Sequence, residues 1–227
     1  MIKYKINFLS EYHIGDGFSS GIADNTIIKD GKGRLIIPGH TVKGVIRDAL
    51  ENLLGDYGIA FCNGTLENNG KLCGVNQEGE KCFICRIFGS PFSEPNFRFT
   101  PAIYEEQYRD GIVKATVTDL LQAQFRVSSH NKIDRETGRV AGKHFFTYEL
   151  GSSAEAFLGE ITPLNPSVNN AGIDNCEILL LAALRLVRRI GGRRRKGWGS
   201  CLIEIMEPQK WKELINKKLK ELLGVKD

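Results

Sequence analysis

The sequence predicts an α+β fold on the split βαβ, ferredoxin-like (RRM-like) plan. Two observations support this prediction. Strand and helix patterns follow one another in the order strand, helix, strands, helix, strand, and the stretches between them have the composition of loops. No internal repeat and no low-complexity linker divides residues 1–227, so we expect a single domain that carries insertions.

The N-terminal part supplies the first strand and the first helix. In residues 2–8, apolar side chains alternate with polar ones, which is the period of a half-buried strand. A glycine-rich stretch follows at 13–33, and Pro38 and Gly39 then interrupt the chain before a helix that Thr41 is expected to cap. The apolar face of this helix consists of Val42, Ile46, Ala49, Leu50 and Leu53.

The middle of the chain contains two segments that do not resemble core elements. Residues 55–96 are rich in Gly, Asn and Cys and lack periodicity, which favours an insertion. Residues 126–143 are polar and contain the turn sequence DRETG, which predicts a protruding hairpin or mobile loop. The strands expected around these segments lie at 97–104, 112–121 and 156–161.

The C-terminal part begins with residues 175–190, which are long and apolar enough for a buried helix. A strand is expected at 201–206. The segment 207–227 closes the chain with a polar helix at 211–223.

The bulk composition is that of a globular protein, with 41% hydrophobic and 26% charged residues. The formal net charge of +4 is small, so any site for a polyanion must come from local clustering. No apolar run approaches the roughly 20 residues that cross a bilayer, and the N-terminus lacks a signal-peptide pattern. We therefore expect a cytoplasmic protein without membrane contact, whose cysteines are reduced.

Local clustering is strongest in GGRRRKGWGS at 191–200. Gly191 and Gly192 allow close approach of the backbone to a ligand. The four consecutive cations at 193–196 suit a polyanion such as a phosphate chain, and Trp198 offers a face for a base or for packing. A solvated cationic turn is the alternative. The cations of the cluster are Arg193, Arg194, Arg195 and Lys196.

A second pair of cations stands near the start of the first predicted helix. Lys43 and Arg47 are four residues apart and therefore share one helix face. The positive end of the helix dipole makes this a favourable setting for phosphate.

Four cysteines lie close together in the insertion, at Cys62, Cys73, Cys82 and Cys85. The last two form a CxxC pair, and four thiolates at these spacings suit a tetrahedral structural Zn²⁺. Such an ion would fold a segment that is too poor in apolar residues to hold its own shape. Buried thiols without a metal, or a redox dithiol, are the alternatives.

Three stretches together resemble the RAMP superfamily of RNA-binding proteins from CRISPR systems. IIPGHTVKGVIRDAL resembles the element that opens the first helix of these proteins, and RIGGRRRKGWGSCLIEI resembles their glycine-rich loop and final strand. HNKIDRETGRVAGKHFFTYEL resembles a segment of the backbone subunit of type III effector complexes. The matches occur in the family's order and extend from residue 1 to about 206.

The resemblance implies a subunit that lines up along a CRISPR RNA and binds target RNA by guide pairing. Its partners would be other RAMP subunits and the large subunit of a type III complex. Lys43, Arg47 and the glycine loop match guide contacts, and residues 125–148 match the thumb that folds over the guide–target duplex. The cations of the thumb are Arg126, Lys132, Arg135, Arg139 and Lys143.

The resemblance also implies a catalytic residue in HIGDGFSSGIADNTIIKDGKGRLIIPG. Asp24 matches the aspartate that cleaves target RNA with a divalent cation such as Mg²⁺, and Asp30 matches a second, structural aspartate. The family often has a proline at the position of Thr26, so the match is incomplete. Asp16 is a rival, and an Asx-turn is the alternative role for Asp24.

Three functions therefore remain open. The chain is a metal-dependent endoribonuclease that doubles as a backbone subunit, or a non-catalytic RNA-binding subunit of the same kind of complex. The third is an RNA-processing enzyme that uses histidine as general acid or base without metal. The available histidines are His13, His40, His130 and His144. No second acid–base partner is visible for His13 or His40 in the sequence.

Overall fold

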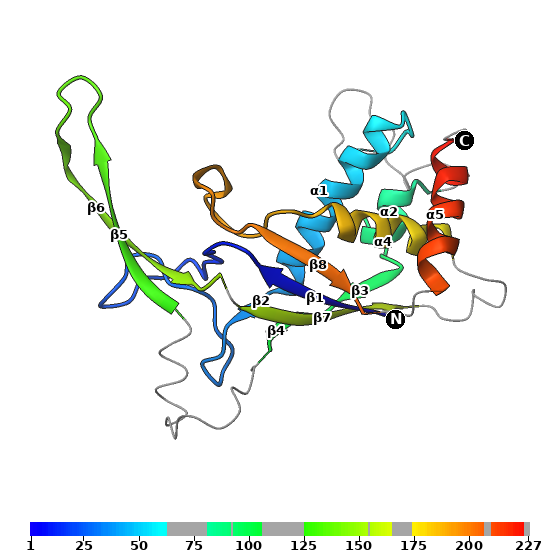
Figure 1. Ribbon diagram of the computed structural model, residues 1–227, viewed down its shortest axis with the longest axis horizontal. Helices are drawn as coiled ribbons and strands as arrows, with labels where there is room; N and C mark the ends of the chain where they lie inside the picture. Colours follow the sequence, from blue (N-terminus) through cyan, green and yellow to red (C-terminus); the bar gives the residue numbers. More distant parts are fainter. Residues whose placement is uncertain are drawn as a thin grey trace.

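In the computed structural model of the chain, a strand from the N-terminus lies inside a six-stranded sheet (Figure 1). This strand, β1 (Ile2–Phe8), pairs with β7 (Ala156–Pro163) on one side and β8 (Cys201–Ile205) on the other. The structure describes residues 1–62, 81–91, 93–105, 125–153, 155–164, 174–206 and 210–224.

The remaining strands of the sheet lie beyond β7. The strand order is β2-β4-β7-β1-β8, with β3 paired to β7, and all of these pairings are antiparallel. The strand expected at 97–104 is divided into two short strands because Pro101, which has no backbone N–H, lies between them. The bounds are β2 (Ile36–Ile37), β3 (Phe97–Phe99) and β4 (Ala102–Tyr104).

The helices gather on one face of this sheet (Figure 1). They are α1 (Gly39–Asp56), α2 (Phe83–Phe88), α4 (Asn175–Leu186) and α5 (Lys210–Leu223). An antiparallel sheet commonly buries one face in this way. In the part of the chain that the structure describes, no helix is long and apolar enough to cross a membrane.

Burial follows the periods read from the sequence. Every second side chain of β1 is buried, from Ile2 to Phe8, as predicted. On α1 the fully buried side chains are spaced four residues apart, at Val42, Ile46 and Leu50. These two apolar surfaces and most of α4 meet in one hydrophobic core.

The start of α1 differs from the prediction. The helix begins at Gly39, and Pro38 rather than Thr41 occupies the N-cap position, without a side-chain cap. The backbone N–H of Thr41 already donates to the Pro38 carbonyl at 2.9 Å. A side chain at Gly39 would place its Cβ 2.3 Å from the Phe99 carbonyl oxygen, so glycine is required where α1 approaches β3.

Two further elements differ from the prediction. The helix expected at 175–190 ends at Leu186, because Val187 is extended and Arg189 forms a β-bridge with Ser200. Within the expected insertion, α2 places Ile84 and Ile87 in the hydrophobic core with 0% exposure. A helix of six residues is too short for periodicity to reveal it.

The hairpin consists of β5 (Phe125–Ile133) and β6 (Val140–Gly151) and protrudes from the sheet (Figure 1). Its turn lies at the predicted DRETG sequence, where the Asp134 carboxylate accepts the backbone N–H groups of Glu136 and Thr137. The strand expected at 112–121 lies outside the described residues.

Candidate functional site

The base of the hairpin contacts two loops, one on a face of the ribbon and the other along the edge of β6. Residues that lie directly opposite each other in an antiparallel ribbon share a face. Phe146 is opposite His130, and Thr147 is opposite Ser129. Because side chains alternate along a strand, Phe146 and Tyr148 belong to one face and Thr147 to the other.

The first face holds the arginine loop, which we define as residues 191–199. Gly191 has a φ of 103°, and a Cβ there would lie 2.5 Å from the His13 carbonyl oxygen. Arg193 has a φ of 53° and is the only non-glycine residue with positive φ among the described residues. Gly192 donates its N–H to the His13 carbonyl at 2.8 Å. The loop therefore has a fixed conformation against the segment that follows β1.

Arg193 connects this loop to the hairpin. Its guanidinium lies over the ring of Tyr148, 4.4 Å from the centroid, and 5.1 Å from the centroid of Phe146. It also donates a hydrogen bond to the Tyr148 hydroxyl. Trp198 packs against His130 with the ring centroids 5.3 Å apart. Burial, with the nearby cations of Lys196 and Arg193, lowers the pKa of His130 below its ordinary value.

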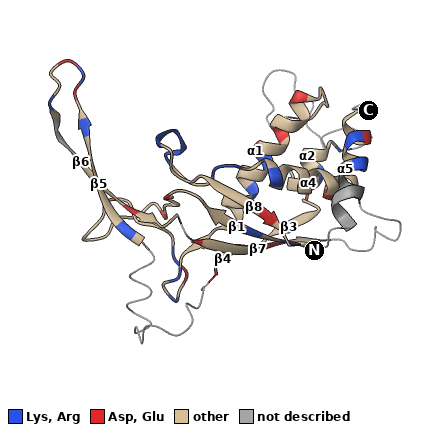
Figure 2. Cartoon of the chain, viewed as in Figure 1, with Lys and Arg blue, Asp and Glu red and all other residues tan. Residues whose placement is uncertain are grey.

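The other cations of the loop point into solvent. Arg194, Arg195 and Lys196 are exposed and form a short 3₁₀ turn. Figure 2 shows this turn as a basic loop between the hairpin and the helical layer. Arg193 thus packs on the hairpin, and its three neighbours are available to a polyanion.

The two cations on α1 are partly engaged. Arg47 forms an ion pair with Glu51 at 2.7 Å, one helical turn away. Lys43 forms no ion pair among the described residues. Burial and the neighbouring Arg47 lower the pKa of Lys43. An anion beside these two cations would relieve their mutual repulsion.

Among the cations of the hairpin, one forms an ion pair and others are exposed. Arg126, near its base, forms a bidentate ion pair with Glu11, and this bond lowers the pKa of the Glu11 carboxyl. Lys132, Arg135 and Arg139 are exposed near the tip. The side chain of Lys143 lies outside the described residues.

The loop with Asp24 runs along the edge of β6 that faces away from β5, where Asn25 forms a parallel β-bridge with Tyr148. The Oδ2 atom of Asp24 accepts the backbone N–H of Thr147 at 2.7 Å and its hydroxyl at 2.9 Å. In return, the N–H of Asp24 donates to Thr147 Oγ1 at 2.9 Å. Two residues further along β6, Glu149 accepts the N–H of Ile27 at 3.0 Å and pairs with Lys29 at 2.9 Å.

The other two aspartates of this loop stabilise turns. Asp16 Oδ1 accepts the Thr26 hydroxyl at 2.6 Å and the N–H of Phe18 at 2.9 Å. Asp30 accepts the N–H groups of Lys32 and Arg34 and pairs with the Arg34 guanidinium at 2.8 Å. Both carboxylates therefore hold the loop in shape.

Asp24 is suited to share a divalent cation with a ligand. Its side chain is exposed, and no hydrogen bond reaches Oδ1 among the described residues. In that part of the chain no cluster of three His, Cys, Asp or Glu residues includes it. Mg²⁺ is commonly held by one or two carboxylates together with substrate phosphates, and Asp24 fits such a shared site.

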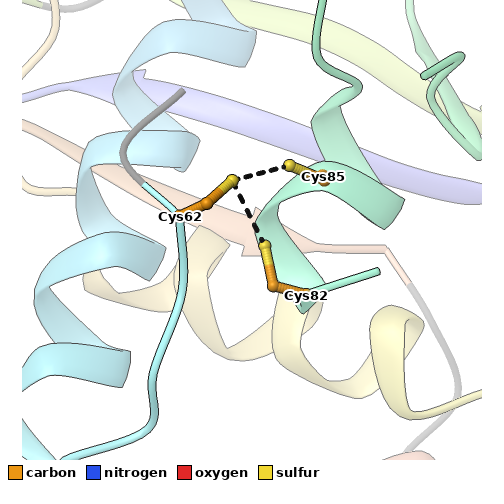
Figure 3. Close-up of side chains that lie close together, drawn as sticks. All are labelled: Cys62, Cys82 and Cys85. Carbon is orange, nitrogen blue, oxygen red and sulfur yellow. Dashed lines mark hydrogen bonds between the residues drawn. The ribbon is translucent and has the colours of Figure 1, made fainter. Parts of the chain in front are cut away.

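Three cysteines converge beside α1 (Figure 3). Cys62 follows α1, and Cys82 and Cys85 lie at the start of α2. The Sγ atom of Cys62 is 3.0 Å from that of Cys85 and 3.8 Å from that of Cys82. Burial raises the pKa of the Cys85 thiol. Cys73 lies outside the described residues.

The cysteine cluster is compact enough for its sulfur atoms to share one metal ion. All three sulfur atoms lie within 4.8 Å of one another. With Zn–S bonds of about 2.3 Å, tetrahedral geometry separates two sulfurs by about 3.8 Å. The Cys62–Cys82 separation equals this value, and the 3.0 Å between Cys62 and Cys85 would widen if the three thiols and a fourth ligand held one Zn²⁺.

Two of the four histidines, His13 and His130, have contacts that indicate packing, and the side chain of His144 lies outside the described residues. His13 is buried, and its Nδ1 lies 2.9 Å from the Glu149 carbonyl oxygen. His130 lies in the aromatic group with Phe146 and Trp198. No ion pair joins a carboxylate to either histidine among the described residues.

Several residues of this site were not predicted from the sequence. They are hairpin side chains that hold the two loops: Phe146, Thr147, Tyr148 and Glu149. The alternation in FFTYEL separates the two faces of the strand, but it does not reveal which loop packs on a face and which pairs along the edge.

Comparison with known proteins identifies the family. A sequence model of the RAMP superfamily matches residues 5–202. One relative is the CRISPR system Cms endoribonuclease Csm3 of Methanocaldococcus jannaschii, which is 34% identical over 89 residues. That match covers 38% of this chain and 32% of the relative, about a third of its length.

Solved structures show the same fold. A chain of the type III-B Cmr-beta complex in its apo state superposes with a TM-score of 0.60 at 12% identity, covering 91% of this chain and 97% of that one. A chain of Cmr-beta bound to cognate target RNA has the same TM-score at 11% identity, covering 90% and 96%. By the extent of the sequence match, and in agreement with this fold, the chain belongs to the RAMP superfamily.

Proposed function

We propose that this chain is a backbone subunit of a type III CRISPR effector complex, which binds CRISPR RNA and cleaves paired target RNA through Asp24. The observation that carries the proposal is the arrangement at the hairpin base. The arginine loop packs on one face of the β5–β6 ribbon, and the Asp24 loop is bonded along the edge of β6 that faces away from β5. A cationic surface and a free carboxylate oxygen are thereby joined to one rigid element.

The matches to known proteins support the same function. The relative from Methanocaldococcus jannaschii is named as a CRISPR endoribonuclease, and the structural neighbours come from a type III-B complex that binds target RNA. The partners would be CRISPR RNA, target RNA, other RAMP subunits and the large subunit. The exposed cations Arg194 to Lys196, with Lys43, would contact the guide backbone.

The fold supports a ferredoxin-like core for this subunit. In the order β8-β1-β7-β4, the central pair and both flanking strands are antiparallel, which is the arrangement of two interlocked split βαβ units. The hairpin would then be the thumb, inserted between β4 and β7. Residues 1–227 would form one domain with this insertion, the cysteine segment and a C-terminal helix.

In the proposed reaction, Asp24 and Thr147 act together at the scissile phosphate. Asp24 would present Oδ1 beside the scissile phosphate, and Thr147 would hold the opposite oxygen. A bound Mg²⁺ would stabilise the charge that develops on the phosphate and orient the attacking 2′-hydroxyl. The exposed cations hold the guide strand, so that the target lies in a fixed register.

Zinc would serve structure rather than reaction. Cys62, Cys82 and Cys85, with Cys73 as the expected fourth ligand, would close the coordination sphere with protein groups alone. Such a site would fix α2 against α1 and leave no position for a substrate.

The alternative is a non-catalytic RNA-binding subunit. The observation that favours it is that Asp24 is hydrogen-bonded to Thr147 and can stabilise the loop without any chemistry. Loss of target cleavage in Asp24→Ala with target binding retained would separate the two functions.

RNA binding is tested through the arginine loop. In the reconstituted complex, Arg194→Ala and Arg195→Ala should each weaken guide RNA binding about 3- to 10-fold and lower the salt dependence by about one unit of slope. Lys217→Ala removes an exposed cation of α5 and is the matched control. Guide affinity that responds equally to all three variants would show that only net charge matters. The same complex should cleave guide-matched RNA in Mg²⁺ and not in chelator.

A further inference from the structure

We propose that Thr147 is the positioning residue for Asp24, because every polar group of Thr147 is bonded to the Asp24–Asn25 segment. Its N–H and hydroxyl donate to Asp24 Oδ2. Its hydroxyl oxygen accepts the N–H of Asp24, and its carbonyl accepts the N–H of Asn25 at 3.1 Å and the side-chain amide of Asn25 at 3.2 Å. The inference rests on the proposed function, in which Asp24 is the catalytic residue.

The hydroxyl does two things at once. It accepts from the backbone of Asp24 and donates to its carboxylate, so it closes a small ring that fixes the rotamer of Asp24. Threonine is suited to this because its β-branched side chain has restricted rotation about χ1. The carboxylate is thereby held by Oδ2, and Oδ1 has no hydrogen bond among the described residues.

The position of Thr147 in the ribbon makes this contact rigid. Glu149, on the same face of β6, holds the loop again through Ile27 and Lys29. On the opposite face, Tyr148 is buried under Arg193. The orientation of Asp24 is therefore set by the same strand that carries the arginine loop, and the carboxylate keeps its place relative to the bound guide.

The test compares Thr147→Val with Thr147→Ser in the reconstituted complex. Valine keeps the shape and the backbone bonds but removes the hydroxyl, so single-turnover cleavage should fall about 10- to 100-fold while target affinity stays within about twofold. Serine restores the hydroxyl and should recover most of the rate. Ser129→Ala, at the cross-strand neighbour of Thr147, is the matched control and should cleave normally.

A second readout does not depend on activity. In the isolated chain, amide hydrogen exchange at Asp24 should become faster in Thr147→Val and remain slow in Thr147→Ser, because the acceptor of that N–H is the hydroxyl. The amide of Asn25 bonds the Thr147 carbonyl and should stay protected in both variants. Unchanged exchange at Asp24 in the valine variant would overturn the inference.

The outcomes separate this inference from the proposed function. If Asp24→Ala abolishes cleavage but Thr147→Val cleaves at the wild-type rate, Thr147 does not position Asp24 and the proposed function stands. If Thr147→Val loses target binding in proportion to cleavage and Thr147→Ser does the same, the residue acts in binding and the inference is wrong. If Asp24→Ala cleaves normally, the proposed function itself fails and the inference with it.

Discussion

Asp16, Asp24 and Asp30 lie in the same loop, and their carboxylates differ in what they contact. Asp16 and Asp30 each accept the N–H of the residue two positions later, which is the Asx-turn expected for aspartate in a loop. Asp24 accepts no such N–H and bonds instead to Thr147, 123 positions away. The Asx-turn interpretation therefore describes the two neighbours, and Asp24 has a contact that an isolated loop cannot provide.

Glu155 is a buried acid whose titration should affect stability. It accepts a hydrogen bond from the buried Tyr12 hydroxyl, and burial raises the pKa of Glu155 from 4.5 to about 7. Between pH 4.5 and pH 7, Glu155 is therefore protonated to a greater extent in the folded state than in the unfolded state. The free energy of unfolding should therefore fall as pH rises from about 4.5 to 7, by at most about 3 kcal/mol from this group.

Urea unfolding of wild type and Glu155→Gln at pH 5 and pH 8 checks this prediction. Glutamine can still accept the Tyr12 hydrogen bond but does not ionise. From pH 5 to pH 8 the wild type should therefore lose more free energy of unfolding than the variant does. An equal difference between the two proteins at both pH values would show that Glu155 does not titrate in this range.

At the scale of elements, α2 begins at the cysteine cluster and packs into the hydrophobic core. It has only six residues, too few for a stable isolated helix, yet Ile84, Ile87 and Phe88 are in the core. The CxxC pair lies at its start, against Cys62. A metal at these thiols would therefore stabilise part of the core as well as the loop.

This predicts about one zinc per purified chain and a loss of stability when it is removed. Cys82→Ser should lower zinc content to a small fraction and reduce the melting temperature by about 5 °C or more. Cys201→Ala, in the buried strand β8, alters packing away from the cluster and should keep the zinc. Metal-free protein with an unchanged melting temperature would contradict the prediction.

For the whole molecule, local sequence patterns predict where strands and helices lie more successfully than they predict which of these elements contact one another. Alternation in residues 2–8 predicts β1 and its buried face, and the DRETG turn predicts the hairpin. Periodicity cannot find α2, which is too short, or the end of α4, where residues beyond Leu186 form a bridge to Ser200 instead of continuing the helix.

Only part of the candidate site could be predicted from the sequence. The arginine loop and Asp24 carry sequence signals of their own, the first by charge and glycine and the second by resemblance to RAMP proteins. Thr147 and Tyr148 carry none, because their importance comes from strand register and from contacts across more than 40 positions. The site is assembled by tertiary contacts that no local pattern specifies.

The central claim is that Asp24 cleaves target RNA within an RNA-guided complex. Its most direct test is the single-turnover cleavage rate of guide-matched RNA by complexes that carry Asp24→Ala or wild type, in Mg²⁺, with target affinity measured in parallel. We predict a loss of about 1,000-fold or more in rate with affinity unchanged, since the variant removes the group that acts on the scissile phosphate. Cleavage at the wild-type rate by fully assembled Asp24→Ala complexes would contradict the account and leave this chain an RNA-binding scaffold.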